Sequence, residues 1–189
     1  KATTALETVY YFDKDRQAMT KFADNLSGFD LKLTPIEDVA SKIGLVDIII
    51  TATAAKSATR VIESEWVRPG VHINSIGGDC PGKTELDPAL LERAKVVVEY
   101  LPQSKVEGEI QNLSSAVYAE LWELVTEAKP GRETPEEITL FDSVGFALED
   151  YTVLKYFYGL SKEMAIGHSV NLIPELEDPK NLFSRLVKD

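Results

Sequence analysis

The chain is short of the residues that carry disulfide, metal or membrane chemistry. Its 189 residues include one cysteine, Cys80, and two histidines, His72 and His168. A single thiol cannot form a disulfide within the chain, so a reducing cytoplasm is the expected location. The two histidines are too few and too far apart in the sequence to predict a metal site. No apolar run approaches the roughly 20 residues that span a bilayer, and we find no signal-peptide pattern.

Positive charge is scarce as well. Lys and Arg number 20 against 31 Asp and Glu, which gives a formal net charge of −11. Such a chain repels phosphate backbones and anionic lipids, so neither nucleic acid nor a membrane is a predicted partner. What the chain has in quantity is apolar residues, 44% of the total, which is enough for the core of one ordinary domain.

The apolar residues alternate between strand and helix patterns. Continuous β-branched and aromatic runs predict strands at 8–13, 46–53, 71–76, 95–100 and 138–142, with a short one at 31–33. Apolar residues at helical spacing predict helices at 15–26, 35–43, 88–94, 115–128 and 146–164. This alternation is typical of an α/β fold, and we expect one mainly parallel sheet with helices on both faces.

The expected organisation is one α/β domain over residues 1–168 and a tail over residues 169–189. No pattern places the tail, which we expect to pack on a domain outside this chain or on a partner subunit. Residues 1–7 look like the end of a helix, so the sequence is expected to be a C-terminal piece of a longer protein. The apolar side chains of the predicted helix at 146–164 are expected to be core.

Polar residues and glycines follow four of the predicted strands. In an open parallel sheet, ligands bind beyond the carboxyl ends of the strands. Asp13 and the segments 51–55, 75–83 and 142–145 stand at those ends. Asp13 also stands where a Rossmann-type fold places an acid for the adenosine ribose, although a turn or cap residue would suit the same position. The glycine-rich loop that would decide between these roles does not occur in the chain.

The segment 74–86 is the most informative in the sequence. Its glycines allow the backbone to approach a ligand closely and to adopt positive φ angles, although an ordinary turn could share this composition. Between the glycines stand one acid, Asp79, and one cation, Lys83. The spacing over 77–84 also matches a phosphate loop. We reject that interpretation because Pro81 leaves little room for the helix N-terminus that must hold the phosphates.

Other candidate groups are interpreted as structural. Cys80 has no identifiable His–Asn pair that would make it a nucleophile, so a packed thiol is expected. Glu107 and Glu109 are interpreted as solvated or structural acids rather than catalytic ones.

Three motifs resemble those of one enzyme family. They are Gly77-Gly-Asp-Cys-Pro-Gly-Lys-Thr-Glu-Leu86, Val98-Glu-Tyr-Leu-Pro-Gln103 with Glu107-Gly-Glu-Ile110, and Phe141-Asp-Ser-Val-Gly-Phe-Ala-Leu-Glu-Asp150. Together they closely resemble bacterial ornithine cyclodeaminases of the μ-crystallin superfamily, from about residue 8 to residue 185. Alanine dehydrogenases and ketimine reductases share the Pro-Gly-Lys and Asp-Ser cores, but the Gly-Gly-Asp-Cys form is similar to the cyclodeaminase branch. The resemblance implies a Rossmann-type NAD-binding domain.

The resemblance also implies a site at the strand ends already identified. The residues implied to contact NAD are Asp13, Thr53, Ser75, Ile76, Gly77, Gly78, Lys83 and Ser143. Asp79 is implied to be the catalytic carboxylate, and Asp79 and Val144 would face the amino-acid substrate. The glycine-rich loop and the basic residues that hold the substrate carboxylate would lie in an N-terminal part outside this chain. The chain alone is therefore expected to be inactive, and the full-length protein to be a homodimer.

The implied activity is that of a lyase in proline biosynthesis, which converts L-ornithine to L-proline and ammonia and recycles NAD within each turnover. An alanine dehydrogenase or ketimine reductase of the same family is an alternative. A non-catalytic NADPH-binding protein like the lens μ-crystallins is another, although Asp79 favours an enzyme because a pure binder needs no carboxylate there. The sequence does not distinguish ornithine from lysine as the substrate.

Overall fold

The computed structural model describes residues 5–54, 59–113, 115–170, 172 and 180. The chain divides into two compact units, with the boundary between Phe146 and Ala147. The predicted domain boundary at residue 168 stays a prediction.

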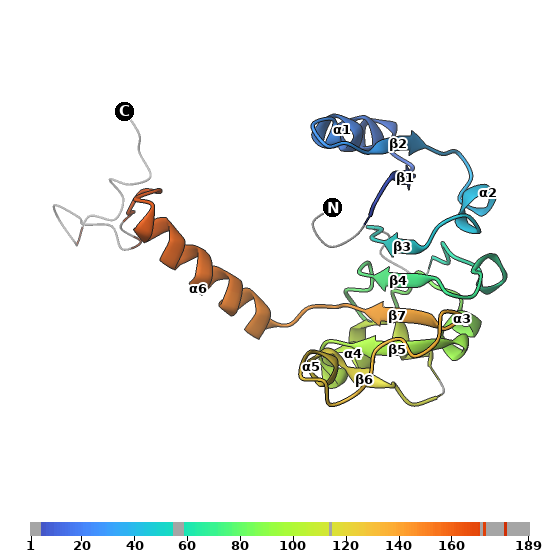
Figure 1. Ribbon diagram of the computed structural model, residues 1–189. Coiled ribbons are helices and arrows are strands. Elements are labelled where there is room, and N and C mark those ends of the chain that lie inside the picture. Colours follow the sequence, from blue (N-terminus) through green and yellow to red (C-terminus); the bar gives the residue numbers. More distant parts are fainter. Residues whose placement is uncertain (1–4, 55–58, 114, 171, 173–179, 181–189) are drawn as a thin grey trace. The chain divides into compact units, whose positions relative to one another are not determined.

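The first unit contains two parallel sheets (Figure 1). In the smaller sheet, β1 (Thr8–Tyr11) pairs with β2 (Lys32–Pro35). The larger sheet has the order β3-β4-β7-β5-β6, formed by β3 (Ile48–Thr51), β4 (His72–Ser75), β5 (Ala94–Val98), β6 (Ala119–Glu120) and β7 (Ile138–Asp142). Every pairing is parallel. The predicted α/β class with a parallel sheet is confirmed.

Short helices connect the strands, and two of them begin as the sequence predicts. The helices are α1 (Arg16–Leu26), α2 (Ala40–Ile43), α3 (Pro88–Arg93), α4 (Leu101–Glu107) and α5 (Leu121–Val125), with 3-10 turns η1 (Ser64–Trp66) and η2 (Glu109–Asn112). Asp15 caps α1, because its carboxylate accepts the N–H of Gln17 at 2.8 Å. Asp87 caps α3 in the same way, with Pro88 in the first turn.

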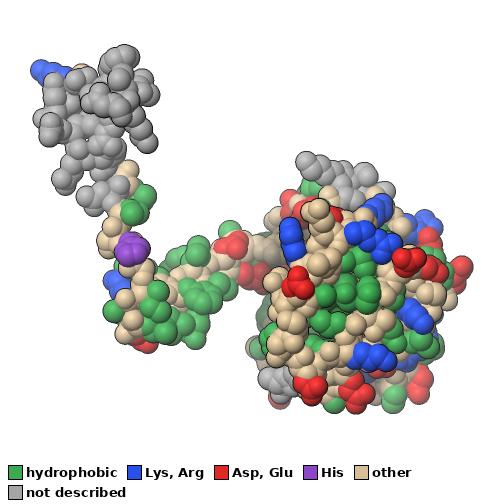
Figure 2. Space-filling view, turned by 90° about the horizontal axis from the view of Figure 1, so that it is seen from above, with side chains coloured by type: hydrophobic (Ala, Val, Ile, Leu, Met, Phe, Trp, Pro, Cys, Tyr) green, Lys and Arg blue, Asp and Glu red, His purple; other side chains and the backbone are tan. Residues whose placement is uncertain are grey.

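The second unit contains one long helix, α6 (Ala147–Glu163), close to the predicted range. Its apolar side chains do not form a core within the described residues. Leu154 is 68% exposed and Tyr158 is 63% exposed, and Figure 2 shows hydrophobic side chains along the surface of this helix. A helix that is apolar over most of its circumference is typical of a buried position.

The core lies against one face of the five-stranded sheet. Ile49, Ile73 and Leu140 point to this face from β3, β4 and β7, and all three are buried. They pack in one cluster with Leu90 and Leu91 of α3. Burial of side chains of this size contributes roughly 1.5–3 kcal/mol each, so this face supplies much of the stability of the unit.

The same face becomes polar at the carboxyl ends of the strands. Because side chains alternate along a strand, the residue two positions after each core residue lies on the same face. Those residues are Thr51 on β3, Ser75 on β4 and Asp142 on β7, and all three are buried. The sheet therefore carries its buried polar groups at the edge where ligands bind to α/β folds.

The prediction of one sheet is wrong. β1 is hydrogen-bonded to β2, β3 is hydrogen-bonded to β4, and no described strand joins β1 to β3. Strand-forming runs of residues indicate where strands occur but do not specify which edges pair, so the division could not be read from the sequence.

The predicted helix at 115–128 is also wrong. Residues 115–118 are irregular, β6 covers 119–120, and only 121–125 are helical. The N–H of Tyr118 donates to the carbonyl of Val96 at 2.9 Å, and β6 then pairs with the end of β5. Hydrogen bonding to the sheet overrides the helical spacing of the apolar residues.

Two further helix predictions need correction. The predicted helix at 35–43 is shorter, because Pro35 belongs to β2 and the helix starts at Ala40. Helix α4, by contrast, lies where no helix was predicted.

Asp142 fixes the junction between α4 and η2. It is fully buried, and its two carboxylate oxygens accept the N–H groups of Glu109 and Ile110, each at 3.0 Å. Gly108 stands directly before these donors. A Cβ atom at Gly108 would overlap the Asp142 carboxylate. The absence of a side chain at position 108 therefore allows the carboxylate to reach both N–H groups.

We predict that Gly108→Ala lowers the free energy of unfolding by about 1–3 kcal/mol, the usual cost of overpacking a buried position. The cause is the overlap with a carboxylate that two hydrogen bonds hold in place. Gly131→Ala is the matched control, since no atom lies within 4 Å of a Cβ there. Urea unfolding of both variants tests this, and equal stability of the two would contradict it.

Candidate functional site

Hydrogen bonds tie the carboxyl ends of three neighbouring strands together. The hydroxyl of Thr51 donates to that of Ser75 at 3.1 Å, and Ser75 in turn donates to Glu109 Oε1 at 3.1 Å. The N–H of Ser143 donates to the carbonyl of Ser75 at 2.9 Å. The structure thus brings together Ser75 and Ser143, two residues implied to contact the cofactor, through the ends of β4 and β7.

Two buried glutamates hold the segment that follows the loop. Glu109 is 1% exposed, and it accepts the N–H of Glu85 at 2.7 Å and the N–H of Leu86 at 3.1 Å. Glu85 is also 1% exposed and accepts the N–H of Thr53 at 2.6 Å. Glu109 is therefore structural, as interpreted, but it is buried rather than solvated. The role of Glu85 could not be predicted from the sequence, because nothing in its neighbourhood indicates burial of an acid.

Gly77 and Gly78 were expected to let a ligand approach the backbone, but they lie against other groups of the protein. A Cβ at Gly77 would overlap the Glu85 carboxylate, and one at Gly78 would lie 3.2 Å from the carbonyl oxygen of Glu107. Both glycines are buried. Only Gly82 among the three has a positive φ, at 79°. The need for glycine at 77 and 78 thus comes from the protein's own carboxylate and backbone on that side.

Asp79 and Lys83 form an ion pair within this loop. The Lys83 ammonium lies 3.0 Å from Asp79 Oδ1, and the two side chains are 5% and 66% exposed. The turn that returns Lys83 toward Asp79 is closed by the N–H of Lys83, which donates to the carbonyl of Cys80 at 3.1 Å. The hydrogen bond from Lys83 lowers the pKa of Asp79 below its usual value. Asp79 is therefore an accessible carboxylate that is ionised at neutral pH.

The turn after β7 is fastened to the end of β5. Glu99 follows β5, and its carboxylate accepts the hydroxyl of Ser143 at 2.5 Å, the N–H of Val144 at 3.1 Å and the N–H of Gly145 at 2.6 Å. Sequence reasoning assigned no role to Glu99. The parallel pairing of β5 with β7 is the signal that brings the two strand ends together.

Asp13 lies in a different part of the first unit, after β1 of the two-stranded sheet. Its carboxylate accepts the N–H of Asp15 at 2.8 Å, which is the turn role that the sequence left open. The described contacts do not connect Asp13 with the other implied site residues. Its role toward an adenosine ribose stays a prediction.

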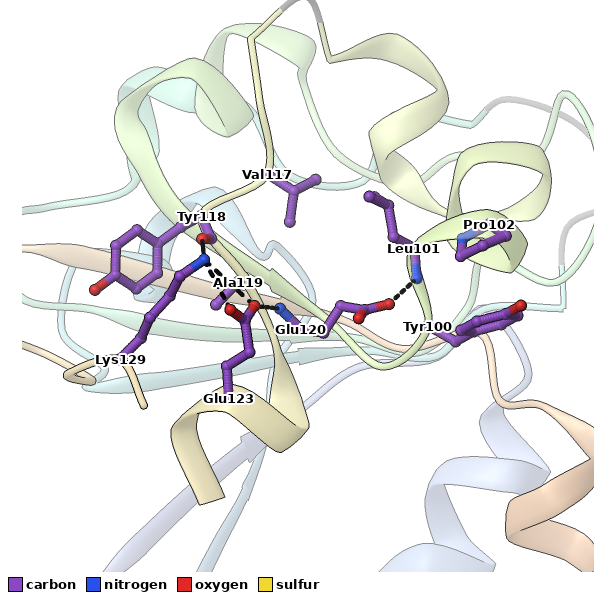
Figure 3. Close-up of a pocket in the computed structure, with 9 residues that line it drawn as sticks. All are labelled: Tyr100, Leu101, Pro102, Val117, Tyr118, Ala119, Glu120, Glu123 and Lys129. Carbon is purple, nitrogen blue, oxygen red and sulfur yellow. Dashed lines mark hydrogen bonds and ion pairs between the residues drawn. The ribbon is translucent and has the colours of Figure 1, made fainter. Parts of the chain in front are cut away.

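A surface pocket of about 430 Å³ lies elsewhere, beside β5 and β6. Figure 3 shows its lining, in which Glu120 accepts the N–H of Leu101 and Lys129 pairs with Glu123. The pocket includes none of the implied site residues. Because Lys129 already pairs with Glu123 and the Glu120 carboxylate already accepts N–H groups of Leu101 and Trp122, we base the candidate site on the carboxyl ends of β3, β4 and β7.

In the part of the chain that the structure describes, no group of three or more His, Cys, Asp and Glu residues could bind a metal ion. Over the same residues, no helix combines the length and the apolar character that crossing a membrane requires.

Burial dominates the titration of the two acids beneath the site. Loss of hydration raises the pKa of Glu109 to about 7 and that of Asp142 to about 6, despite the N–H groups that each accepts. A raised pKa means that the folded state binds the proton more tightly than the unfolded chain does. The stability contributed by Glu109 is therefore present below its ordinary value of 4.5 and is lost as the pH rises through about 7.

We predict that the free energy of unfolding falls by about 3 kcal/mol between pH 4.5 and pH 8 on account of Glu109, at about 1.4 kcal/mol per pKa unit. Glu109→Gln should lose this decline and keep only the separate decline below about pH 6 that Asp142 contributes. Glu107→Gln is the control, because the Glu107 carboxylate bonds instead to Gln103 on α4. Urea titrations across this range test the prediction, and an unchanged slope in Glu109→Gln would refute it.

Comparison with known proteins identifies relatives of the whole chain. It is 39% identical to an ornithine cyclodeaminase of Brucella melitensis over 189 residues, all of this chain and 53% of that protein. The chain thus spans about half the length of this curated relative.

Solved structures of similar proteins also match nearly the whole chain and about half of their own length. An archaeal alanine dehydrogenase dimer with bound NAD matches with a TM-score of 0.80 and 33% identity, covering 91% of this chain and 55% of that one. A lysine cyclodeaminase matches with a TM-score of 0.81 and 29% identity, covering 94% and 52%. The sequence model of the ornithine cyclodeaminase/mu-crystallin family matches residues 1–164. With its parallel sheet and its loop from Gly77 to Leu86, the chain belongs to the ornithine cyclodeaminase/mu-crystallin family.

Proposed function

We propose that the full-length protein containing this chain is an NAD-dependent ornithine cyclodeaminase, which converts L-ornithine to L-proline and ammonia. One observation carries the proposal. The loop after β4 presents an accessible, ionised Asp79 held by a buried Lys83, in a chain that is similar along its whole length to an ornithine cyclodeaminase. The activity is proposed for the full-length protein because the chain spans about half of that relative.

The ends of the strands fit a dinucleotide. The hydroxyl of Thr53 is buried and has no hydrogen-bond partner among the described residues, so a polar group of a ligand would complete it. Ile76 is 49% exposed directly after β4 and offers an apolar surface to a flat ring. The residues that would hold NAD are Asp13, Thr53, Ser75, Ile76, Gly77, Gly78, Lys83 and Ser143. Bound NAD would supply a hydride acceptor and, once reduced, a hydride donor. The NAD-bound alanine dehydrogenase of similar structure supports this choice.

Asp79 would handle charge and protons at the substrate nitrogen. Oxidation of an amino acid at its α-carbon places positive charge on the attached nitrogen. An ionised carboxylate stabilises that charge and can accept a proton from the substrate ammonium. Lys83 holds Asp79 Oδ1 in place and keeps the carboxylate ionised. Val144, in the turn after β7, would face the remainder of the amino acid.

The two separate sheets suggest where further chain would pair. An additional parallel strand between β1 and β3 would satisfy both free edges and join the sheets into one. On β3, Ile48 and Ile50 are 44% and 65% exposed and would gain cover from neighbouring chain. We propose that the glycine-rich loop of the NAD site follows such a strand, outside these residues.

The substrate is the finer part of the proposal. The chain is similar to a lysine cyclodeaminase and to an alanine dehydrogenase as well as to an ornithine cyclodeaminase. An assay of the full-length protein with NAD and ornithine, lysine or alanine distinguishes these activities, because the products are proline, pipecolate and pyruvate. We also propose a homodimer, supported by the alanine dehydrogenase dimer and the exposed apolar surface of α6, and testable by sedimentation. The single cysteine of the chain supports the proposal of a cytoplasmic location.

We predict that Asp79→Asn lowers kcat for proline formation by about 100-fold or more and changes NAD affinity little. The amide keeps the size of the side chain but removes the charge that stabilises the substrate cation. Asp47→Asn is the matched control, since Asp47 is also an exposed aspartate with one cationic partner, Arg68, but precedes β3 at the opposite end of the strands. Steady-state kinetics and NAD titration test this. Near-normal turnover in Asp79→Asn would remove Asp79 from the mechanism.

A second prediction concerns the choice of cofactor. A carboxylate at Asp13 would repel a 2′-phosphate, so the full-length protein should bind NAD at least about 10-fold more tightly than NADP. Asp13→Asn should narrow this ratio, because the amide oxygen can still accept the N–H of Asp15 while the charge is lost. Asp24→Asn on α1 is the control and should leave the ratio unchanged. Dissociation constants for both cofactors decide the matter, and a ratio that is insensitive to Asp13→Asn would show that Asp13 serves only the turn.

A further inference from the structure

The turn formed by residues 143–145 has all of its hydrogen-bond donors engaged. The N–H of Ser143 donates to the carbonyl of Ser75 at 2.9 Å. The hydroxyl of Ser143 and the N–H groups of Val144 and Gly145 donate to the single carboxylate of Glu99. Since residues 143–145 carry these four donors and no others, the turn has no donor left for a ligand.

This arrangement fixes what the turn can offer. A serine hydroxyl that donates its hydrogen to a carboxylate keeps its lone pairs for a second partner. Ser143 can therefore accept a hydrogen bond from a ligand but cannot donate one. The nearby charge of Glu99 also repels anions. A phosphate or carboxylate group would meet no donor and an unfavourable field at this turn, whereas an N–H group would meet an acceptor.

We propose that Glu99 is a positioning residue that makes Ser143 a hydrogen-bond acceptor for an N–H group of the ligand. The inference rests on the proposed function, in which Ser143 contacts NAD and Val144 faces the amino acid. Two ligand groups have the required chemistry, the carboxamide of the nicotinamide ring and the ammonium of the amino-acid substrate. Both are neutral or cationic donors, and the turn discriminates against acids in either position.

The effect of Glu99→Gln follows from geometry. A glutamine has one oxygen and one NH2 group where the glutamate has two acceptor oxygens. Placing the NH2 group against the N–H groups of Val144 and Gly145 would set donors against donors. The favourable orientation therefore points the NH2 group at Ser143, whose oxygen becomes the acceptor and whose hydrogen turns toward the ligand. The substitution reverses the hydrogen-bonding character of Ser143.

The turn has a second attachment that should keep it folded in this variant. The rings of Tyr100 and Phe146, the residues that follow Glu99 and Gly145, lie 5.4 Å apart between centroids. Gly145 has a φ of 71°, which its lack of a side chain permits. Both features are independent of the charge at Glu99.

The test compares Glu99→Gln with Glu120→Gln in the full-length protein. Glu120 is a matched control because its carboxylate, at the end of β6, also accepts two backbone N–H groups, from Leu101 and Glu123, and one side-chain group, the indole N–H of Trp122. The probes are NAD and its analogue with a carboxylate in place of the carboxamide, with ligand affinity as the readout. If the carboxamide is the donor, the unmodified protein should bind NAD at least about 10-fold more tightly than the acid analogue, a ratio typical of one hydrogen bond in a desolvated site.

If the carboxamide is the donor, Glu99→Gln weakens NAD binding about 10-fold and narrows the ratio between the two probes. If the substrate ammonium is the donor, both dissociation constants stay the same and the KM for the amino acid rises by a similar factor. Either result supports the proposal and identifies the group. Unchanged affinities together with an unchanged KM, in a variant that melts like Glu120→Gln, overturn it.

Hydrogen exchange of the ligand-free protein gives a readout that needs no activity. The amides of Val144 and Gly145 should exchange slowly in the unmodified protein and faster in Glu99→Gln, because the neutral amide oxygen of glutamine is a weaker acceptor than the carboxylate oxygen that it replaces. Rapid exchange of both amides in the folded, unmodified protein would overturn the positioning role even if proline is formed. Conversely, slow exchange and the expected loss of NAD affinity would stand even if ornithine proved not to be the substrate.

Discussion

Buried carboxylates that accept backbone N–H groups are the interaction on which the rest of the site depends. Loops follow the carboxyl ends of parallel strands, and the backbone N–H groups of these loops have no hydrogen-bond partners in the sheet. Here Asp142, Glu109 and Glu85 receive such groups from segments distant in sequence. Each of these N–H groups would be costly to leave without an acceptor in the interior.

This constraint explains why glycine occurs where it does. Gly108 and Gly77 lie against the carboxylates of Asp142 and Glu85, so that a side chain at either position would displace an acceptor. Glu85 and Glu109 hold the loop from Gly77 to Leu86 on its buried side. Asp79 stays exposed on the solvent side of the same loop. A rigid base under an accessible carboxylate is the arrangement that proton transfer and charge stabilisation require.

The sequence predicted those parts of the structure that local pattern determines. The apolar runs predicted four of the five strands of the large sheet, all except β6, and Asp15 and Pro88 marked helix starts that the structure retains. The strand-end rule led to Ser75 and Ser143, which the sheet joins.

Edge pairing was not predictable, since β1 could as well have joined β3. The helix expected at 115–128 failed because hydrogen bonds to β5 outweigh apolar spacing. The supporting acids Glu85, Glu99 and Glu109 were missed or given no site role, because burial and partners depend on contacts across more than twenty residues of sequence.

The central claim is that the ligand site lies at the carboxyl ends of β3, β4 and β7, above these buried acids. A crystal structure of the full-length protein with NAD and L-ornithine tests it most directly. We expect the nicotinamide ring between Ile76 and the turn at Ser143, with Asp79 facing the amino-acid nitrogen and with Glu85, Glu109 and Asp142 in the contacts described. A nicotinamide ring bound elsewhere, such as in the pocket beside β5 and β6, or an Asp79 carboxylate turned away from the amino acid, would contradict the account.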